Sequence, residues 1–177
     1  MRGWLRPAAA LAGAVLVAAC TASSSTPTTG SHPAMQPPPA TAYPCGLANV
    51  RTSGPGPGRL VLGVISVRDE LWPTAPVHQG RWRHWQKDPL WIRAGRQTVT
   101  ITVPAAWRNR AAITWGLNVG IVSTLRLPGC PSASGTWNGY AGGFYLRSAS
   151  ACVPLVFGVG RRSAMARVGV GRRCPVL

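Results

Sequence analysis

The chain has 177 residues and a formal net charge of +16 at pH 7, because nineteen Lys and Arg residues stand against three Asp and Glu residues. The length allows one domain beside a leader and a linker. So few acids leave little room for paired-carboxylate catalysis. The charge favours a polyanionic partner, such as anionic lipid or wall polymer. The arginine excess also fits the amino-acid usage of a high-GC genome, but the shortage of acids does not.

Residues 1–19 have the layout of a bacterial signal peptide. Two arginines precede an apolar run that is shorter than the roughly 20 residues of a membrane-spanning helix. The run ends in the tetrad Val17-Ala18-Ala19-Cys20, which resembles the lipobox of bacterial lipoproteins. The resemblance implies cleavage before Cys20 and a diacylglycerol on its sulfur, which supplies two acyl chains for stable anchoring. The alternative is an ordinary secretory signal followed by an unrelated cysteine.

Residues 20–43 are rich in Ser, Thr and Pro and show no apolar periodicity. Such a stretch cannot bury enough apolar surface to fold, so we expect a disordered, lipid-anchored tether. Fully extended, at ~3.3 Å per residue, its length is on the order of 70 Å. The folded domain is expected over residues 44–177.

The pattern of residues 44–177 is that of a β domain. Leu60–Val67 is a dense apolar run that predicts a central strand, and Gln97–Val103 alternates threonines with branched apolar residues. Further strands are expected at residues 89–93, 112–117, 119–127, 143–147, 155–159 and 166–170. About eight short strands separated by Pro and Gly predict an immunoglobulin-like β-sandwich, with a small closed β-barrel as the alternative.

Four cysteines remain beside Cys20, and no C-x-x-C pair occurs, which disfavours thioredoxin-like and zinc-knuckle chemistry. An exported domain is expected to oxidise them. A hairpin between residues 155–159 and 166–170, with its turn near Ser163, brings the flanking cysteines together. The expected bonds are Cys152–Cys174 and Cys45–Cys130; the strongest rival pairs Cys130 with Cys152 and Cys45 with Cys174.

The densest chemical cluster is Arg81-Trp82-Arg83-His84-Trp85. Interleaved arginine and tryptophan can bind anions, stack on planar groups or sit at a membrane interface. The simpler alternative is that one tryptophan fills the sandwich and the arginines are solvated. The candidate polyanion or interface contacts are Arg81, Trp82, Arg83, Trp85, Arg161, Arg162, Arg172 and Arg173.

No enzyme is expected. Asp69 and Glu70 are adjacent, so a strand would point them to opposite faces and a turn would use them in surface ion pairs. His78 and His84 lie in no nucleophile motif, and their spacing predicts no metal site, so we expect exposed loop histidines, no catalytic residue, no metal and no cofactor.

Three segments, at residues 86–93, 140–144 and 152–155, are similar to exported lipoproteins of high-GC Gram-positive bacteria. The similarity covers roughly residues 85–174. It implies an extracytoplasmic β domain without assigned activity, and no functional residue can be transferred.

The sequence therefore predicts a protein anchored by lipid to the outer face of the cell membrane. We expect a binding or adaptor module whose basic surface faces anionic lipid or wall polymer. The alternative is a structural or assembly protein that packs on another envelope protein, with its charge incidental. Nucleic acid is not expected as a partner of an exported chain.

Acylation at Cys20 is directly testable. Intact-mass and detergent-partition measurements on the protein from its host should find a lipid-bearing N-terminus at Cys20. Cys20→Ala should abolish the lipid and leave the chain released or as an uncleaved precursor. An unchanged lipid-bearing fraction in the variant would contradict the lipoprotein interpretation.

Overall fold

The structure, a computed structural model, describes residues 41–42, 45, 50–131 and 136–175. All of them belong to one unit, residues 38–177. The expected signal peptide with Cys20, and the expected tether apart from Thr41–Ala42, lie outside the described residues.

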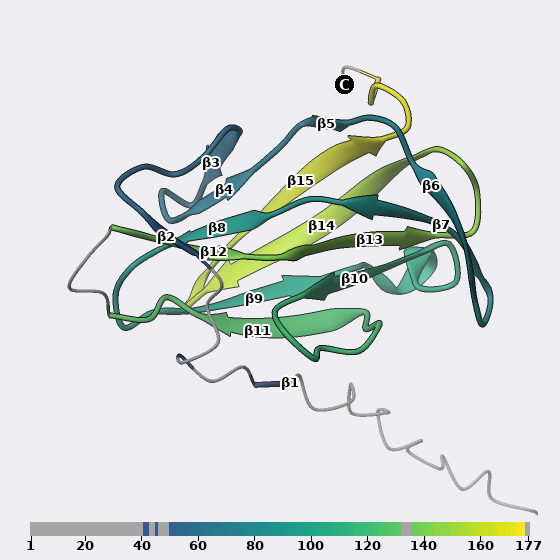
Figure 1. The fold of residues 1–177 in the computed structure, drawn as a ribbon. Helices are drawn as coiled ribbons and strands as arrows, with labels where there is room; N and C mark the ends of the chain where they lie inside the picture. Colours follow the sequence, from purple (N-terminus) through teal and green to yellow (C-terminus); the bar gives the residue numbers. More distant parts are fainter. Residues whose placement is uncertain (1–40, 43–44, 46–49, 132–135, 176–177) are drawn as a thin grey trace, which may run out of the picture. The chain divides into compact units, whose positions relative to one another are not determined.

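The first layer is a six-stranded sheet (Figure 1). Its order is β1 (Thr41–Ala42), β11 (Thr124–Pro128), β9 (Thr98–Thr102), β14 (Ala151–Val159), β15 (Arg162–Val170) and β5 (Glu70–Leu71). Pairs are antiparallel except at the edges, where β1 and β5 run parallel to their neighbours. In β9 the period-two pattern buries Val99 and Ile101 completely, whereas its threonines face outward.

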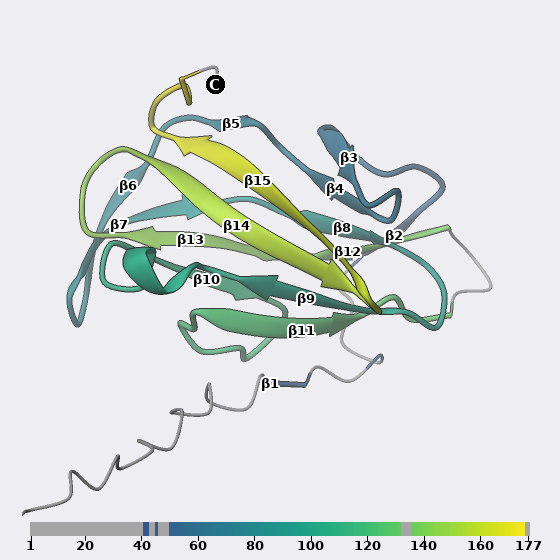
Figure 2. The same cartoon turned by 180° about the vertical axis from the view of Figure 1, so that it is seen from behind.

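The second layer consists of two sheets that continue into one another. One is ordered β10 (Ala111–Trp115), β13 (Gly142–Leu146), β7 (Trp82–Lys87) and β6 (Ala75–Gln79); the other is ordered β2 (Val50–Thr52), β12 (Trp137–Tyr140), β8 (Leu90–Arg93), β4 (Ile65–Val67) and β3 (Arg59–Val61). Figures 1 and 2 show β7 running on into β8 and β12 into β13, facing the first layer. After β9 a short 3-10 helix, η2 (Ala105–Trp107), leads toward β10.

The core lies between the layers and takes side chains from both. Its tryptophan is Trp115 on β10, which is fully buried and meets the ring of Phe144 edge-on at 5.3 Å. The Trp115 indole N–H donates to the backbone oxygen of Asp88 at 2.7 Å, so the buried polar atom has a partner. Val153, Leu155 and Phe157 of β14 close the core from the first layer.

The expected β-sandwich is confirmed, and the described strands do not close into a barrel. The described strands are more numerous than the eight expected, and several are only two or three residues long, whereas β14 and β15 extend over nine residues each. The prediction of one central strand at Leu60–Val67 was wrong: β3 and β4 form a hairpin at a sheet edge. Its turn has positive φ at Leu62 (54°) and Gly63 (75°), and the turn conformation reverses the apolar run.

The expected hairpin near the C-terminus is confirmed as β14–β15, but its turn lies at Gly160–Arg161, before the expected Ser163. Ile113 and Trp115 share a buried face, as expected. Leu117 does not join them, because β10 ends at Trp115 and leaves Leu117 about half exposed.

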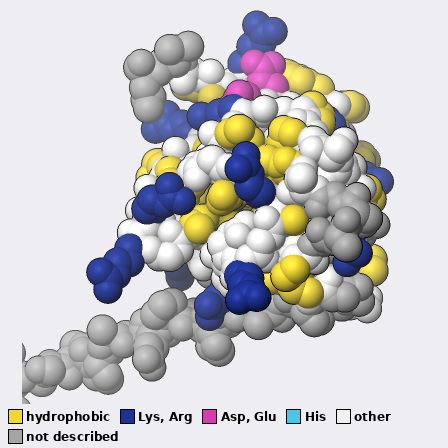
Figure 3. Space-filling model, turned by 90° about the vertical axis from the view of Figure 1, so that its left-hand side faces the viewer, with side chains coloured by type: hydrophobic (Ala, Val, Ile, Leu, Met, Phe, Trp, Pro, Cys, Tyr) yellow, Lys and Arg dark blue, Asp and Glu magenta, His cyan; other side chains and the backbone are white. Residues whose placement is uncertain are grey.

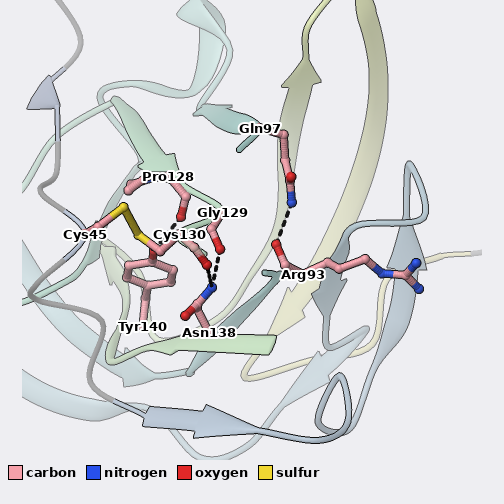
Figure 4. The surroundings of a disulfide bond; sticks show 8 residues. All are labelled: Cys45, Arg93, Gln97, Pro128, Gly129, Cys130, Asn138 and Tyr140. Carbon is pink, nitrogen blue, oxygen red and sulfur yellow. Dashed lines mark hydrogen bonds between the residues drawn. A yellow bond between two sulfur atoms is a disulfide. The ribbon is translucent and has the colours of Figure 1, made fainter. Parts of the chain in front are cut away.

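Both expected disulfides are present, Cys45–Cys130 and Cys152–Cys174. Figure 4 shows the first one beside the segment after β11. The Asn138 amide donates to the carbonyls of Gly129 and Cys130, and the Tyr140 hydroxyl donates to Pro128 O. Asn138 and Tyr140 both lie on β12, so these bonds tie the segment that holds Cys130 to that strand.

Asp88 marks the break in the second layer. The chain leaves this layer after β4, passes through β5 on the edge of the first layer and returns at β6. Asp88 is fully buried there, and its carboxylate oxygens have no hydrogen-bond partner; Arg68 Nε lies 3.7 Å away. Burial raises the pKa of Asp88 to about 7, against the lowering effect of Arg68.

Stability should therefore fall with rising pH. Between the unfolded pKa of 3.8 and the folded value of about 7, the folded state binds the extra proton, so ionisation costs up to about 4 kcal/mol across this window. Denaturant unfolding at several pH values should show this decline in the wild type and not in Asp88→Asn. An equal decline in the variant, or stability that rises with pH, would refute the assignment.

Candidate anion-binding groove

One end of the sandwich, here called the groove end, collects the start of β10, the end of β13, the start of β14 and the end of β15. At this end the last paired residues are Ala111 with Leu146 in one sheet and Ala151 with Val170 in the other. Loops from both layers therefore meet there.

A groove of about 690 Å³ opens at this end. Its floor is the outer face of β14 and β15, where Pro154 pairs with Arg167. The segment after η2, the loop after β13 and the tail after β15 surround it. The lining residues are Trp107, Asn109, Arg110, Arg147, Ser148, Ser150, Ala151, Cys152, Pro154, Arg167, Arg172 and Pro175.

The charges of the groove are all of one sign. Arg110, Arg147, Arg167 and Arg172 line it, and no acid does. The three acids of the chain are engaged elsewhere: Asp69 pairs with Arg59 at 2.6 Å, Glu70 with Arg173 at 3.2 Å, and Asp88 with Arg68. The ion pair at Asp69 and the one at Glu70 confirm the surface role expected for these acids. None of these three acids pairs with a groove arginine, so the positive charge of the groove can attract an external anion.

Backbone contacts hold two of these arginines in place. The Arg147 N–H donates to Arg110 O at 3.1 Å, which ties the loop after β13 to the start of β10. The Arg110 N–H donates to Trp107 O at 2.8 Å, and the Arg110 guanidinium lies over the Trp107 ring, 5.5 Å from its centroid. A stacked guanidinium keeps its fork free for a planar or tetrahedral anion.

The tail that carries Arg172 is folded back onto β15. The disulfide joins Cys174 to Cys152, with 5.2 Å between their Cα atoms. Gly169 permits the return, because a Cβ there would lie 2.2 Å from Arg172 O. The tail therefore forms one wall of the groove.

The arginine and tryptophan cluster predicted at residues 81–85 lies at the β6–β7 turn and start of β7. The Arg81 guanidinium stacks 4.9 Å above Trp82 and donates to Arg108 O at 3.4 Å, next to the groove wall. Arg83 donates to Gly80 O at 2.7 Å. Both arginines are exposed, as the simpler alternative expected. Trp82 is buried, as the same alternative expected, although it lies outside the main core cluster, which contains Trp115.

The remaining predicted contacts are dispersed. Arg172 lines the groove, while Arg173 pairs with Glu70. Arg161 and Arg162 lie at the β14–β15 turn, which is at the opposite end of these nine-residue strands from the groove. Figure 3 views the side of the molecule that carries this turn, and its basic side chains stand apart from one another. Trp85 packs near Tyr145, with 6.4 Å between the rings.

Sequence reasoning missed Trp107, Arg110, Arg147 and Arg167. A signal for two of them was present. Arg167 lies within a predicted strand of the hairpin, and Arg147 ends the strand that precedes Cys152. The expected disulfide places both near Arg172. The position of Arg110 depends on the pairing of β10 with β13, which the sequence did not indicate.

The histidines lie on strands, contrary to the loops expected. His78 is exposed on β6, and His84 is half-buried on β7, opposite the core residue Leu146. Within the described ranges no three His, Cys, Asp or Glu side chains are grouped as metal ligands would be. The described part of the chain also holds no helix with the length and apolarity to span a membrane.

Comparison of the chain with protein-family models, with curated proteins and with solved structures finds no match.

The tail wall is predicted to depend on its disulfide. Cys152→Ser/Cys174→Ser should lower the free energy of unfolding by about 2–5 kcal/mol. It should also release the tail, so trypsin should cut after Arg172 and Arg173 faster in the folded variant than in the folded wild type. Mass spectrometry of timed digests measures this. Cys45→Ser/Cys130→Ser, the control, should leave tail cleavage slow; equal rates in the two variants would refute the disulfide's role in the wall.

Proposed function

We propose that this chain is a lipid-anchored extracytoplasmic protein, without enzymatic activity, whose groove binds an anionic component of the cell envelope. The lipobox-like tetrad at Cys20 supports the anchor, and two disulfides fit an oxidising compartment.

The observation that carries the binding proposal is the set of four arginines around one groove without an acid. Guanidinium groups make bidentate, charge-assisted hydrogen bonds to phosphate and carboxylate oxygens. Ser148, Ser150 and Asn109 add neutral donors on the same rim. Phosphate-bearing or carboxylate-bearing polymers and headgroups match this chemistry.

The surrounding charge supports the same partner class. Arg81 and Arg108 extend the basic surface from the groove wall toward the β6–β7 turn. Attraction between this surface and an extended polyanion raises the association rate and weakens with salt.

The test uses residues 20–177 with Cys20→Ala, which lack both the leader and the lipid, and a soluble glycerol-phosphate polymer as the probe. Calorimetry at low and physiological salt should show binding that weakens steeply with salt. Arg110→Gln/Arg147→Gln should weaken it at least roughly tenfold, because each charge-assisted hydrogen bond contributes about 1.5–3 kcal/mol.

Arg161→Gln/Arg162→Gln is the matched control, since it removes the same charge at the β14–β15 turn. It should have a small effect. Equal losses in the two variants would contradict the groove and favour diffuse charge. Absence of binding to both this polymer and anionic vesicles would favour the alternative, a structural protein that docks on another envelope protein.

A further inference from the structure

The groove end carries an exposed tryptophan that the groove itself does not use. Trp72 follows β5, whose Leu71 pairs with Val170, the last residue of β15. Its side chain is 59% exposed. Among the large apolar side chains that are exposed in the described residues, it is the aromatic one.

Trp72 lies between two segments that carry groove arginines. On one side the Gly171 N–H donates to Leu71 O at 2.9 Å, directly before Arg172. On the other side the Thr74 hydroxyl donates to Ala149 O at 2.9 Å, in the loop that begins with Arg147. An exposed indole thus lies between two chain segments that carry arginines of the groove.

The short strand β1 begins toward this same end. Strand β1 runs parallel to β11, with Thr41 opposite Leu125 (Figure 1). The start of β11 lies beside the end of β9, where Thr124 pairs with Thr102, and β9 leads directly into η2 and the groove wall. Thr41, at the start of β1, therefore lies on the side of the domain toward the groove end.

We propose that the groove end docks on the anionic phospholipid surface to which Cys20 is anchored, with Trp72 seated among the headgroups and the groove arginines binding lipid phosphates. This inference rests on the proposed function, which it deepens by naming the partner. Tryptophan prefers the membrane–water interface, and basic residues beside it are attracted to anionic headgroups. A lipid anchor combined with a basic patch gives stable attachment.

The position of the anchor favours this membrane over a distant polymer. A tether with an extended length on the order of 70 Å keeps the domain near its own bilayer, so that the groove end meets lipid at a high effective concentration. The domain then lies against the membrane with its β14–β15 turn pointing away.

The experiment uses residues 20–177 with Cys20→Ala, which lack the leader and the lipid. It compares their binding to vesicles of phosphatidylglycerol and phosphatidylcholine, to vesicles of phosphatidylcholine alone, and to the soluble glycerol-phosphate polymer. Co-sedimentation gives the partition coefficient. Quenching of tryptophan fluorescence by bromine-labelled lipid chains reports whether an indole enters the interface.

Anionic vesicles should bind the chain and quench its fluorescence, and neutral vesicles should do so weakly. Trp72→Ala should lower the partition coefficient several-fold and remove most of the quenching, while its binding to the soluble polymer is unchanged. Met165→Ala is the matched control, because Met165 is 63% exposed on the outer face of β15, away from its end. It should leave all three readouts unchanged.

Binding to the polymer but not to anionic vesicles would overturn the membrane docking and leave the proposed function standing. Vesicle binding that is insensitive to Trp72→Ala and shows no quenching would also overturn it. Failure to bind either probe would remove the proposed function together with this inference.

Discussion

The register of the β14–β15 hairpin is the constraint on which the rest of the structure depends. Its inner face supplies Leu155, Phe157 and Val168 to the core, and its outer face supplies the floor of the groove. A slip of one residue would exchange the two faces, placing arginine in the core and apolar side chains in water. The same register puts Gly169 opposite Cys152, which lets the tail fold back and the disulfide close.

The shortage of acids shapes the surface as strongly as the hairpin shapes the interior. Asp69 and Glu70 sit at the β5 edge, where each holds one arginine, and Asp88 is buried at the break in the second layer. None of them reaches the groove. A buried carboxylate beside Arg68, without hydrogen bonds, costs stability when it is ionised, and this cost is separate from the charge that faces solvent.

The sequence was informative where local pattern decides structure. The alternation in residues 97–103 and the C-terminal hairpin were predicted, because period-two burial is a local signal. The hairpin brings together Cys152 and Cys174, which are 22 positions apart, and leaves Cys45 and Cys130, 85 positions apart, to pair with each other. The apolar run at residues 60–67 misled, since its turn depends on backbone conformation at Leu62 and Gly63. The groove was largely missed. Strand β10 pairs with β13, about thirty positions away, and no local pattern in the sequence around Arg110 or Arg147 indicates that pairing.

Four arginines around one groove repel one another, so the fold must hold them together against that repulsion. The disulfide at Cys174 fixes the tail, and the hydrogen bond from Arg147 N to Arg110 O joins two loops. The Trp107 ring stacks on one face of the Arg110 guanidinium. An anion in the groove would replace this repulsion by attraction without moving the backbone. Binding to the folded state alone must then stabilise it, and the affinity benefits because the arginines are already in place. The Cys152–Cys174 disulfide thus allows the folded state to keep four arginines close together despite their mutual repulsion.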